Sequence, residues 1–154
     1  MTSTLNSFVN PVGNISGEGK IKIIEGLTVL ATAVARNNYE KGWREPGAVP
    51  RPIGDLIALL HSEVTEAFEA YRNNEPELWF EYPDKETPFE EFRTDPDTGE
   101  TTLGKPQGIT SELADVIIRV FDMAAELELP LVEALLAKHE YNQTRPYRHG
   151  GKAV

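Results

Sequence analysis

Two short acidic pairs are the residues of this chain whose types and spacing indicate the clearest chemistry. They are Glu63-x-x-Glu66 in HSEVTEAFEA and Glu112-x-x-Asp115 in SELADVIIRV, and each lies in an otherwise apolar, helix-like stretch. At three-residue spacing, both members of a pair project from the same side of a helix. If the two helices pack together, four carboxylates converge, and a bound cation is the simplest relief for that buried charge.

A helical wheel shows on which side of each helix these acids lie. On the later helix, Glu112, Asp115, Arg119 and Asp122 fall within a sector of roughly 80°, and most of the remaining circumference is apolar. This pattern predicts a helix that is buried on several sides. On the earlier helix, Glu63 and Glu66 border the apolar stripe, which places both pairs at the edge of a core.

Each pair also has a simpler explanation. An acid in the first turn of a helix, such as Glu112, is stabilised by the helix dipole by about 0.3–1 kcal/mol. Asp115 could pair with Arg119 at i, i+4. A metal site is favoured over these explanations because both pairs lie on apolar helices and a basic helix end follows them.

The available donor atoms favour a hard cation. The chain has no cysteine and three histidines. None of the histidines is preceded at the third position by Glu, so the Glu-x-x-His motif of di-iron bundles is absent. No EF-hand loop is present either, which disfavours Ca²⁺. A set of oxygen donors suits Mg²⁺, with Mn²⁺ as a substitute, and Mg²⁺ commonly bridges carboxylates and substrate phosphates.

A second group of polar residues occupies the end of the last predicted helix. Lys138, Asn142 and Arg145 recur at i, i+4 and i+7, within roughly 60° of one another, and Lys152 follows in the basic tail. Lysine binds phosphate as a compact positive charge, and arginine binds it through two parallel hydrogen bonds. The alternative is a cationic helix end that only offsets its own dipole.

Composition limits the kind of partner. The net charge is −10, and residues 131–154, with four Lys and Arg against two Glu, carry +2, which leaves −12 on residues 1–130. Duplex nucleic acid is therefore an unfavourable partner, and a helix-turn-helix DNA binder is disfavoured. No apolar run approaches the roughly 20 residues that span a bilayer, and the N-terminus has no signal-peptide pattern. These features predict a cytoplasmic protein without a membrane partner.

The elements that must position these residues are helical. Apolar periodicity and capping residues predict an all-α fold with helices over about 20–37, 52–72, 110–127 and 130–145. Residues 73–108 contain five prolines and ten acids and form a mostly irregular insertion, in which Asp-Pro-Asp-Thr-Gly is compatible with a small β-hairpin. Residues 1–17 are expected to be a flexible arm, and residues 18–154 a single domain.

With these residues in place, the chain resembles the MazG-like superfamily of all-α nucleoside triphosphate pyrophosphatases. The matching strings are ALLHSEVTEAFEAYR, GKPQGITSELADVIIRVFD and KHEYNQTRPYRHGGK, in the family's order. The insertion departs from the pattern, since it is longer than the link between motifs in the smallest members. The resemblance implies a four-helix bundle that forms homodimers or homotetramers and uses Mg²⁺ to hydrolyse a (deoxy)nucleoside triphosphate to its monophosphate and pyrophosphate.

The resemblance also implies roles for individual residues. The metal ligands would be Glu63, Glu66, Glu112 and Asp115, and the phosphate contacts Lys138, Asn142, Arg145 and Lys152. Either Glu63 or Glu66 would also orient or deprotonate the attacking water. Asp122 would support the ligands or add a further one, and Lys41 and Trp43 are candidates for contacts with the base. The alternative is a non-catalytic helical protein that binds a nucleotide or a partner and has a structural metal site.

Overall fold

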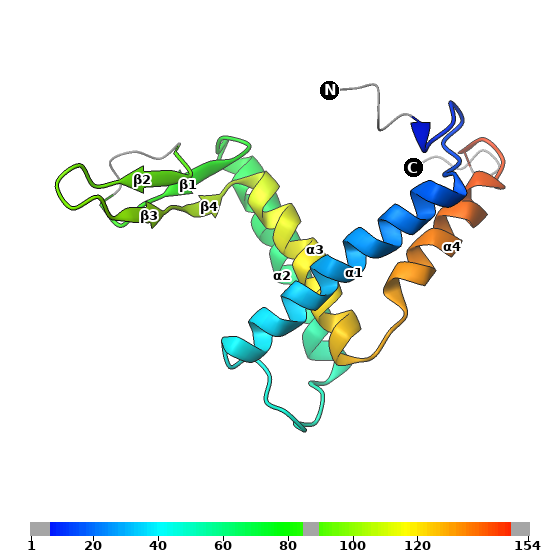
Figure 1. The fold of residues 1–154 in the computed structure, drawn as a ribbon, viewed down its shortest axis with the longest axis horizontal. Coiled ribbons are helices and arrows are strands. Elements are labelled where there is room, and N and C mark those ends of the chain that lie inside the picture. The colour runs from blue at the N-terminus through cyan, green and yellow to red at the C-terminus, as the bar shows by residue number, and fades with distance from the viewer. Residues whose placement is uncertain (1–6, 85–89, 149–154) are drawn as a thin grey trace. The chain divides into compact units, whose positions relative to one another are not determined.

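The computed structural model describes residues 7–84 and 90–148, and these ranges are mostly helical (Figure 1). The elements in chain order are α1 (Gly17–Glu40), α2 (Ile53–Arg72), β1 (Trp79–Glu81), β2 (Phe92–Thr94), β3 (Thr101–Leu103), β4 (Lys105–Gln107), α3 (Ile109–Glu126) and α4 (Leu131–Gln143). The four predicted helices are confirmed to within a few residues at each end. The arrangement as a MazG-like bundle stays a prediction.

Local sequence explains where the helices begin. Ser16 caps α1, because its Oγ accepts a hydrogen bond from the backbone N–H of Gly19. Pro52 and Pro130 directly precede α2 and α4. Proline suits the start of a helix because it lacks the N–H that would have no partner there. None of the described helices combines the length and the apolar character needed to cross a bilayer.

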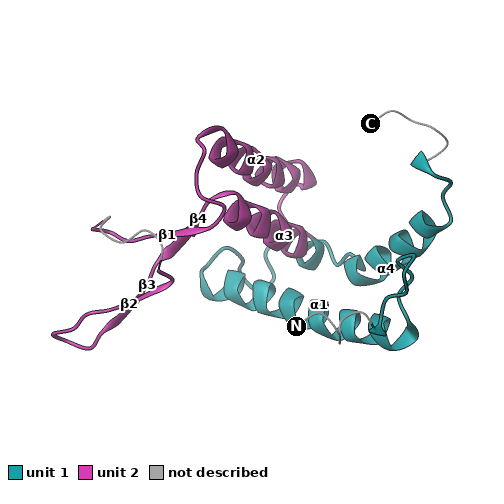
Figure 2. Ribbon diagram, turned by 90° about the horizontal axis from the view of Figure 1, so that it is seen from above, with its two compact units in different colours: residues 1–48, 124–154 teal, residues 49–123 magenta. Residues whose placement is uncertain are grey.

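The chain divides into two compact units, residues 49–123 and residues 1–48 with 124–154 (Figure 2). In the unit of residues 49–123, β1 follows α2, β4 precedes α3, and the two strands pair antiparallel with Phe80 opposite Pro106. This pairing brings the C-terminal end of α2 to the N-terminal end of α3. The helices therefore run side by side in opposite directions, with Leu56, Ala67 and Phe121 buried.

The insertion contains more regular structure than the sequence indicates. The expected hairpin is confirmed as β2 and β3, with Phe92 opposite Leu103. Its turn is closed by Asp95, whose Oδ1 accepts hydrogen bonds from the backbone N–H groups of Asp97 and Thr98. The pairing of β1 with β4 was not predicted, because three-residue strands leave almost no alternating pattern to detect.

In the unit of residues 1–48 and 124–154, α1 and α4 contact each other, and residues 7–16 form a folded segment that we call the N-terminal turn. Val9 and Ile15 form an antiparallel β-bridge within it. The described part of the predicted flexible arm is therefore folded; residues 1–6 lie outside the described residues. Its Asn, Ser and Gly content is typical of both flexible segments and side-chain-capped turns, so composition could not separate the two.

The prediction that α3 is buried on several sides is wrong for the single chain. Phe121 and Ala124 are buried, but Leu113 and Ile117 are 51% and 52% exposed. On α2, Phe68 is likewise 56% exposed. One side of α3 thus contributes to the core, while apolar side chains on another side remain accessible.

Candidate metal centre

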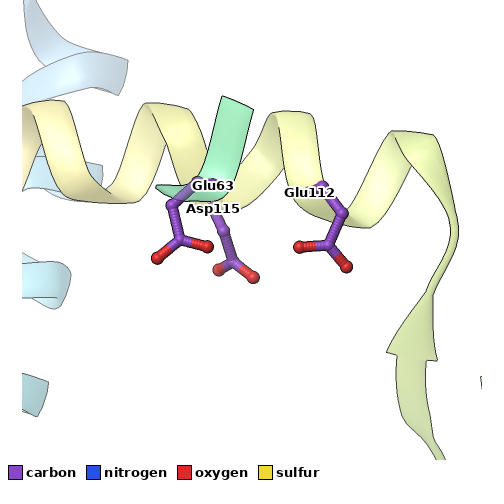
Figure 3. A group of neighbouring side chains, drawn as sticks. All are labelled: Glu63, Glu112 and Asp115. Carbon is purple, nitrogen blue, oxygen red and sulfur yellow. The ribbon is translucent and has the colours of Figure 1, made fainter. Parts of the chain in front are cut away.

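Three of the four predicted carboxylates converge between α2 and α3 (Figure 3). Glu63 from α2, and Glu112 and Asp115 from α3, each place one carboxylate oxygen within 4.8 Å of the others. Two ligand oxygens of one octahedral Mg²⁺ are about 3 to 4 Å apart, since each Mg–O distance is about 2.1 Å. Small rotamer adjustments would therefore bring the three oxygens into one coordination sphere, and an oxygen-only donor set fits that ion.

The local sequence accounts for this arrangement. Because α3 begins at Ile109, Glu112 lies in its first turn and Asp115 follows on the same side, three residues later. The antiparallel course of α2 and α3, fixed by the β1–β4 pairing, brings Glu63 to this level of α3. Glu63 is buried, and Glu112 and Asp115 are half-buried.

The electrostatics of the cluster favour a cation. Burial raises the pKa of Glu112 above its ordinary value, and the neighbouring charges of Glu66, Asp115 and Glu63 raise it further, while Lys105 opposes them. Like charges at close range disfavour ionisation of each carboxyl group. A metal ion bound here would remove that repulsion and would compete with protons for the same oxygens.

Asp115 is in a similar environment. Its pKa is also raised, first by burial and then by the charge of Glu63, whereas Arg119 and Lys105 lower it. Lys105 lies on β4, just before α3, and acts on both acids of α3. This lysine was not predicted from the sequence, because only the pairing of β1 with β4 places it near the cluster.

Arg119 has a different partner from the one its spacing indicates. Its Nε donates a hydrogen bond to Glu63 Oε1 at 2.8 Å, across from α3 to α2. The i, i+4 pairing with Asp115 was the simpler expectation, although the charge of Arg119 does lower the pKa of Asp115. Arg119 therefore neutralises part of the cluster and orients the buried carboxylate of Glu63.

Glu66 and Asp122 lie outside the group of three converging carboxylates. Glu66 is exposed on α2, yet close enough for its charge to raise the pKa of Glu112. Asp122 is buried, with 3% of its surface exposed, and its Oδ2 accepts a hydrogen bond from Arg51 Nη2 at 2.8 Å. A guanidinium partner is thus present at the buried carboxylate of Asp122.

We expect Arg51→Ala to lower the free energy of unfolding by about 1–3 kcal/mol, because it removes a charged hydrogen-bond partner from the buried Asp122 carboxylate. Urea denaturation followed by circular dichroism would measure the change. Arg36→Ala is the matched control, since Arg36 is exposed on α1. Equal effects of the two substitutions would contradict a stabilising role for the Arg51–Asp122 pair.

The predicted phosphate and base contacts belong to the other compact unit. Lys138 and Asn142 lie on α4, Arg145 follows just after its end, and all three are exposed. Lys41 and Trp43 follow the end of α1 and are also exposed, Trp43 by 69%. The fourth predicted phosphate contact, Lys152, lies outside the described residues. The carboxylates and the basic residues are thus carried by different units of the chain.

No family model, curated protein or solved structure matches this chain. The likeness to the MazG-like superfamily therefore depends on the three sequence strings alone.

Proposed function

We propose that this protein is a Mg²⁺-dependent nucleotide pyrophosphatase that hydrolyses (deoxy)nucleoside triphosphates to the monophosphate and pyrophosphate. The observation that carries the proposal is the convergence of Glu63, Glu112 and Asp115 from two helices, with their oxygens within 4.8 Å. The raised pKa values of Glu112 and Asp115 support it, because burial and the neighbouring carboxylates disfavour the charged forms, and a bound cation would offset both effects. An oxygen-only cluster is suited to holding Mg²⁺ against a polyphosphate.

In this proposal Glu63, Glu112 and Asp115 hold the metal. When bound, Mg²⁺ supplies charge that neutralises the triphosphate and lowers the pKa of a coordinated water. Glu66 is a better candidate than Glu63 for the general base that deprotonates the attacking water, because Glu63 already accepts a hydrogen bond from Arg119. Glu66 takes a proton from water as the water oxygen bonds to the α-phosphorus, and the bond from that phosphorus to the bridging oxygen breaks to release pyrophosphate.

The exposed polar residues of the α4 region take the phosphate role. Lys138 and Arg145 are cations and Asn142 adds an amide donor, and all three are accessible to a ligand. Such groups stabilise charge on the transferring and leaving phosphates. Lys41 and Trp43 remain our candidates for contacts with the nucleobase.

The exposed apolar side chains of α2 and α3 fit a homodimer or homotetramer. Light scattering after size-exclusion chromatography would test this.

We expect Lys138→Ala to raise the KM for a triphosphate by about tenfold, because it removes one charge-assisted phosphate contact. Mg²⁺ affinity, measured by calorimetry without nucleotide, should change little. Lys138→Arg keeps the charge and is the control that should retain most of the binding. If Lys138→Ala weakened Mg²⁺ and nucleotide binding equally, Lys138 would have a different role.

A non-catalytic binding protein is the second candidate, and the Arg119–Glu63 hydrogen bond at 2.8 Å favours it. That internal ion pair already engages one oxygen of the buried Glu63 carboxylate, which suits a structural cluster. A panel of NTPs and dNTPs, incubated with the protein and Mg²⁺ and analysed by anion-exchange chromatography, separates the two. We expect monophosphate and pyrophosphate. Mg²⁺ binding with no turnover across the panel would support the non-catalytic protein instead.

A further inference from the structure

The N-terminal turn is closed by its own hydrogen bonds. Asn10 Oδ1 accepts from the backbone N–H groups of Val12 and Asn14, at 3.1 Å and 2.9 Å. The N–H of Ser16 donates to the carbonyl oxygen of Phe8 at 2.8 Å, alongside the β-bridge. The segment thus has a defined shape before any contact with a helix is considered.

The turn packs closely on the first turn of α1. Gly19 is buried there, and a Cβ added to it would lie 2.9 Å from side-chain atoms of both Phe8 and Ile15. Real Cβ atoms do not approach that closely, so only glycine fits. The Nζ of Lys22 lies 5.3 Å from the centroid of the Phe8 ring, which adds a cation–π contact.

The same turn also contacts α4. His139 Nε2 lies 2.9 Å from the carbonyl oxygen of Gly13, and because a carbonyl only accepts, the imidazole must donate. A Cβ on Gly13 would come within 3.3 Å of the Gln143 amide, so the backbone approaches α4 closely. Beside these contacts, Lys20 of α1 forms an ion pair with Glu140 of α4.

These contacts lie on one side of α4. At 100° per residue, His139, Glu140 and Gln143 fall within roughly 100°. The proposed phosphate contacts Lys138 and Asn142 lie about 100° and 60° from His139 on the same wheel, outside this side, and Arg145 follows the end of the helix. No residue of α4 is buried, so little apolar packing fixes the rotation of this helix about its axis. Polar contacts with the N-terminal turn and α1 must supply that constraint.

We infer that the N-terminal turn is a clamp that fixes α4 against α1, and that His139 is a positioning residue for the proposed phosphate contacts of α4, Lys138 and Asn142. The positioning role rests on the proposed function, whereas the clamp does not. His139 acts here through a hydrogen bond to Gly13, and it touches no substrate in this account. A neutral or a charged imidazole can donate that hydrogen bond.

Two substitutions in the full chain test the clamp. His139→Ala removes the donor, whereas His139→Gln places an amide Nε2 donor at a similar reach. His61→Ala, at an exposed histidine of α2, is the control. Hydrogen–deuterium exchange of the metal-free protein should be faster in the N-terminal turn and α4 of His139→Ala only. Unchanged exchange in His139→Ala, or equal acceleration in His139→Gln, would overturn the clamp.

The positioning role has a separate kinetic test. In His139→Ala we expect KM for the triphosphate to rise about three- to tenfold, the loss typical of one hydrogen bond, with little change in kcat. His139→Gln should restore KM. Faster exchange with an unchanged KM would overturn the positioning role. If the wild type had no turnover and exchange still responded as expected, the clamp would stand and the proposed function would fail.

Discussion

Glu112→Gln is expected to lower metal-dependent turnover by about a hundredfold or more. Removing a single group that stabilises the charge of a transition state typically causes a loss of this size. The same substitution should raise the Tm of the metal-free protein. Both effects have one cause, because Glu112 is half-buried beside three other carboxylates that raise its pKa. The amide keeps the shape, removes the repulsion and no longer offers an anionic ligand. Turnover and thermal melts of one protein preparation would measure both.

The pH dependence of stability follows from the same pKa shifts. The pKa values of Glu112 and Asp115 are raised above 4.5 and 3.8, so the folded protein holds their protons to a higher pH than the unfolded chain does. Stability of the metal-free protein should therefore fall as pH rises from those values through the raised pKa values, and the penalty is complete above the raised values. Glu112→Gln should weaken this dependence.

Glu69→Gln is the matched control for Glu112→Gln. Glu69 is exposed on α2, and the wheel places it away from the cluster. We expect this control to retain wild-type turnover, metal-free Tm and pH dependence. A Glu112→Gln protein that turned over like the control, or that lost stability without metal, would contradict the assignment of Glu112 to a repulsive metal-binding cluster.

Magnesium itself is expected to raise the Tm by about 5–10 °C when its concentration exceeds Kd a hundredfold, because it binds the folded cluster and not the dispersed acids of the unfolded chain. Scanning calorimetry over a Mg²⁺ series would give the shift, with Mn²⁺ expected to substitute. Glu112→Gln should lose most of the shift and Glu69→Gln should keep it. An equal shift in all three proteins would place the ion elsewhere.

Much of the helical frame and part of the site could be predicted from sequence. Pro52 and Pro130 fix where α2 and α4 begin, and Asp-Pro-Asp-Thr-Gly fixes a hairpin, whereas α1 begins at Gly17 after the Ser16 cap, three residues before the predicted start. The i, i+3 spacing of Glu112 and Asp115 fixes a shared side of α3, whatever the tertiary structure. Local sequence therefore predicts the starts of α2 and α4, the hairpin turn, and the shared side of Glu112 and Asp115 on α3.

Contacts between distant residues could not be predicted in the same way. Sequence spacing predicts that Arg119 pairs with Asp115, four residues before it. Arg119 donates its hydrogen bond to Glu63 because α2 packs against α3. The pairing of Asp122 with Arg51, 71 positions away, is another such contact. His139 gave no signal at all, because its partner is a backbone carbonyl, which every residue carries. Each of these partners is set by tertiary structure and not by spacing.

The most direct test of the proposed chemistry is hydrolysis in ¹⁸O-labelled water, with mass spectrometry of the products from wild type and Glu112→Gln. Attack at the α-phosphorus predicts one labelled oxygen in the monophosphate, none in pyrophosphate, a strict need for Mg²⁺, and almost no product from Glu112→Gln. Label in pyrophosphate, release of labelled orthophosphate, or undiminished labelling by Glu112→Gln would contradict the account.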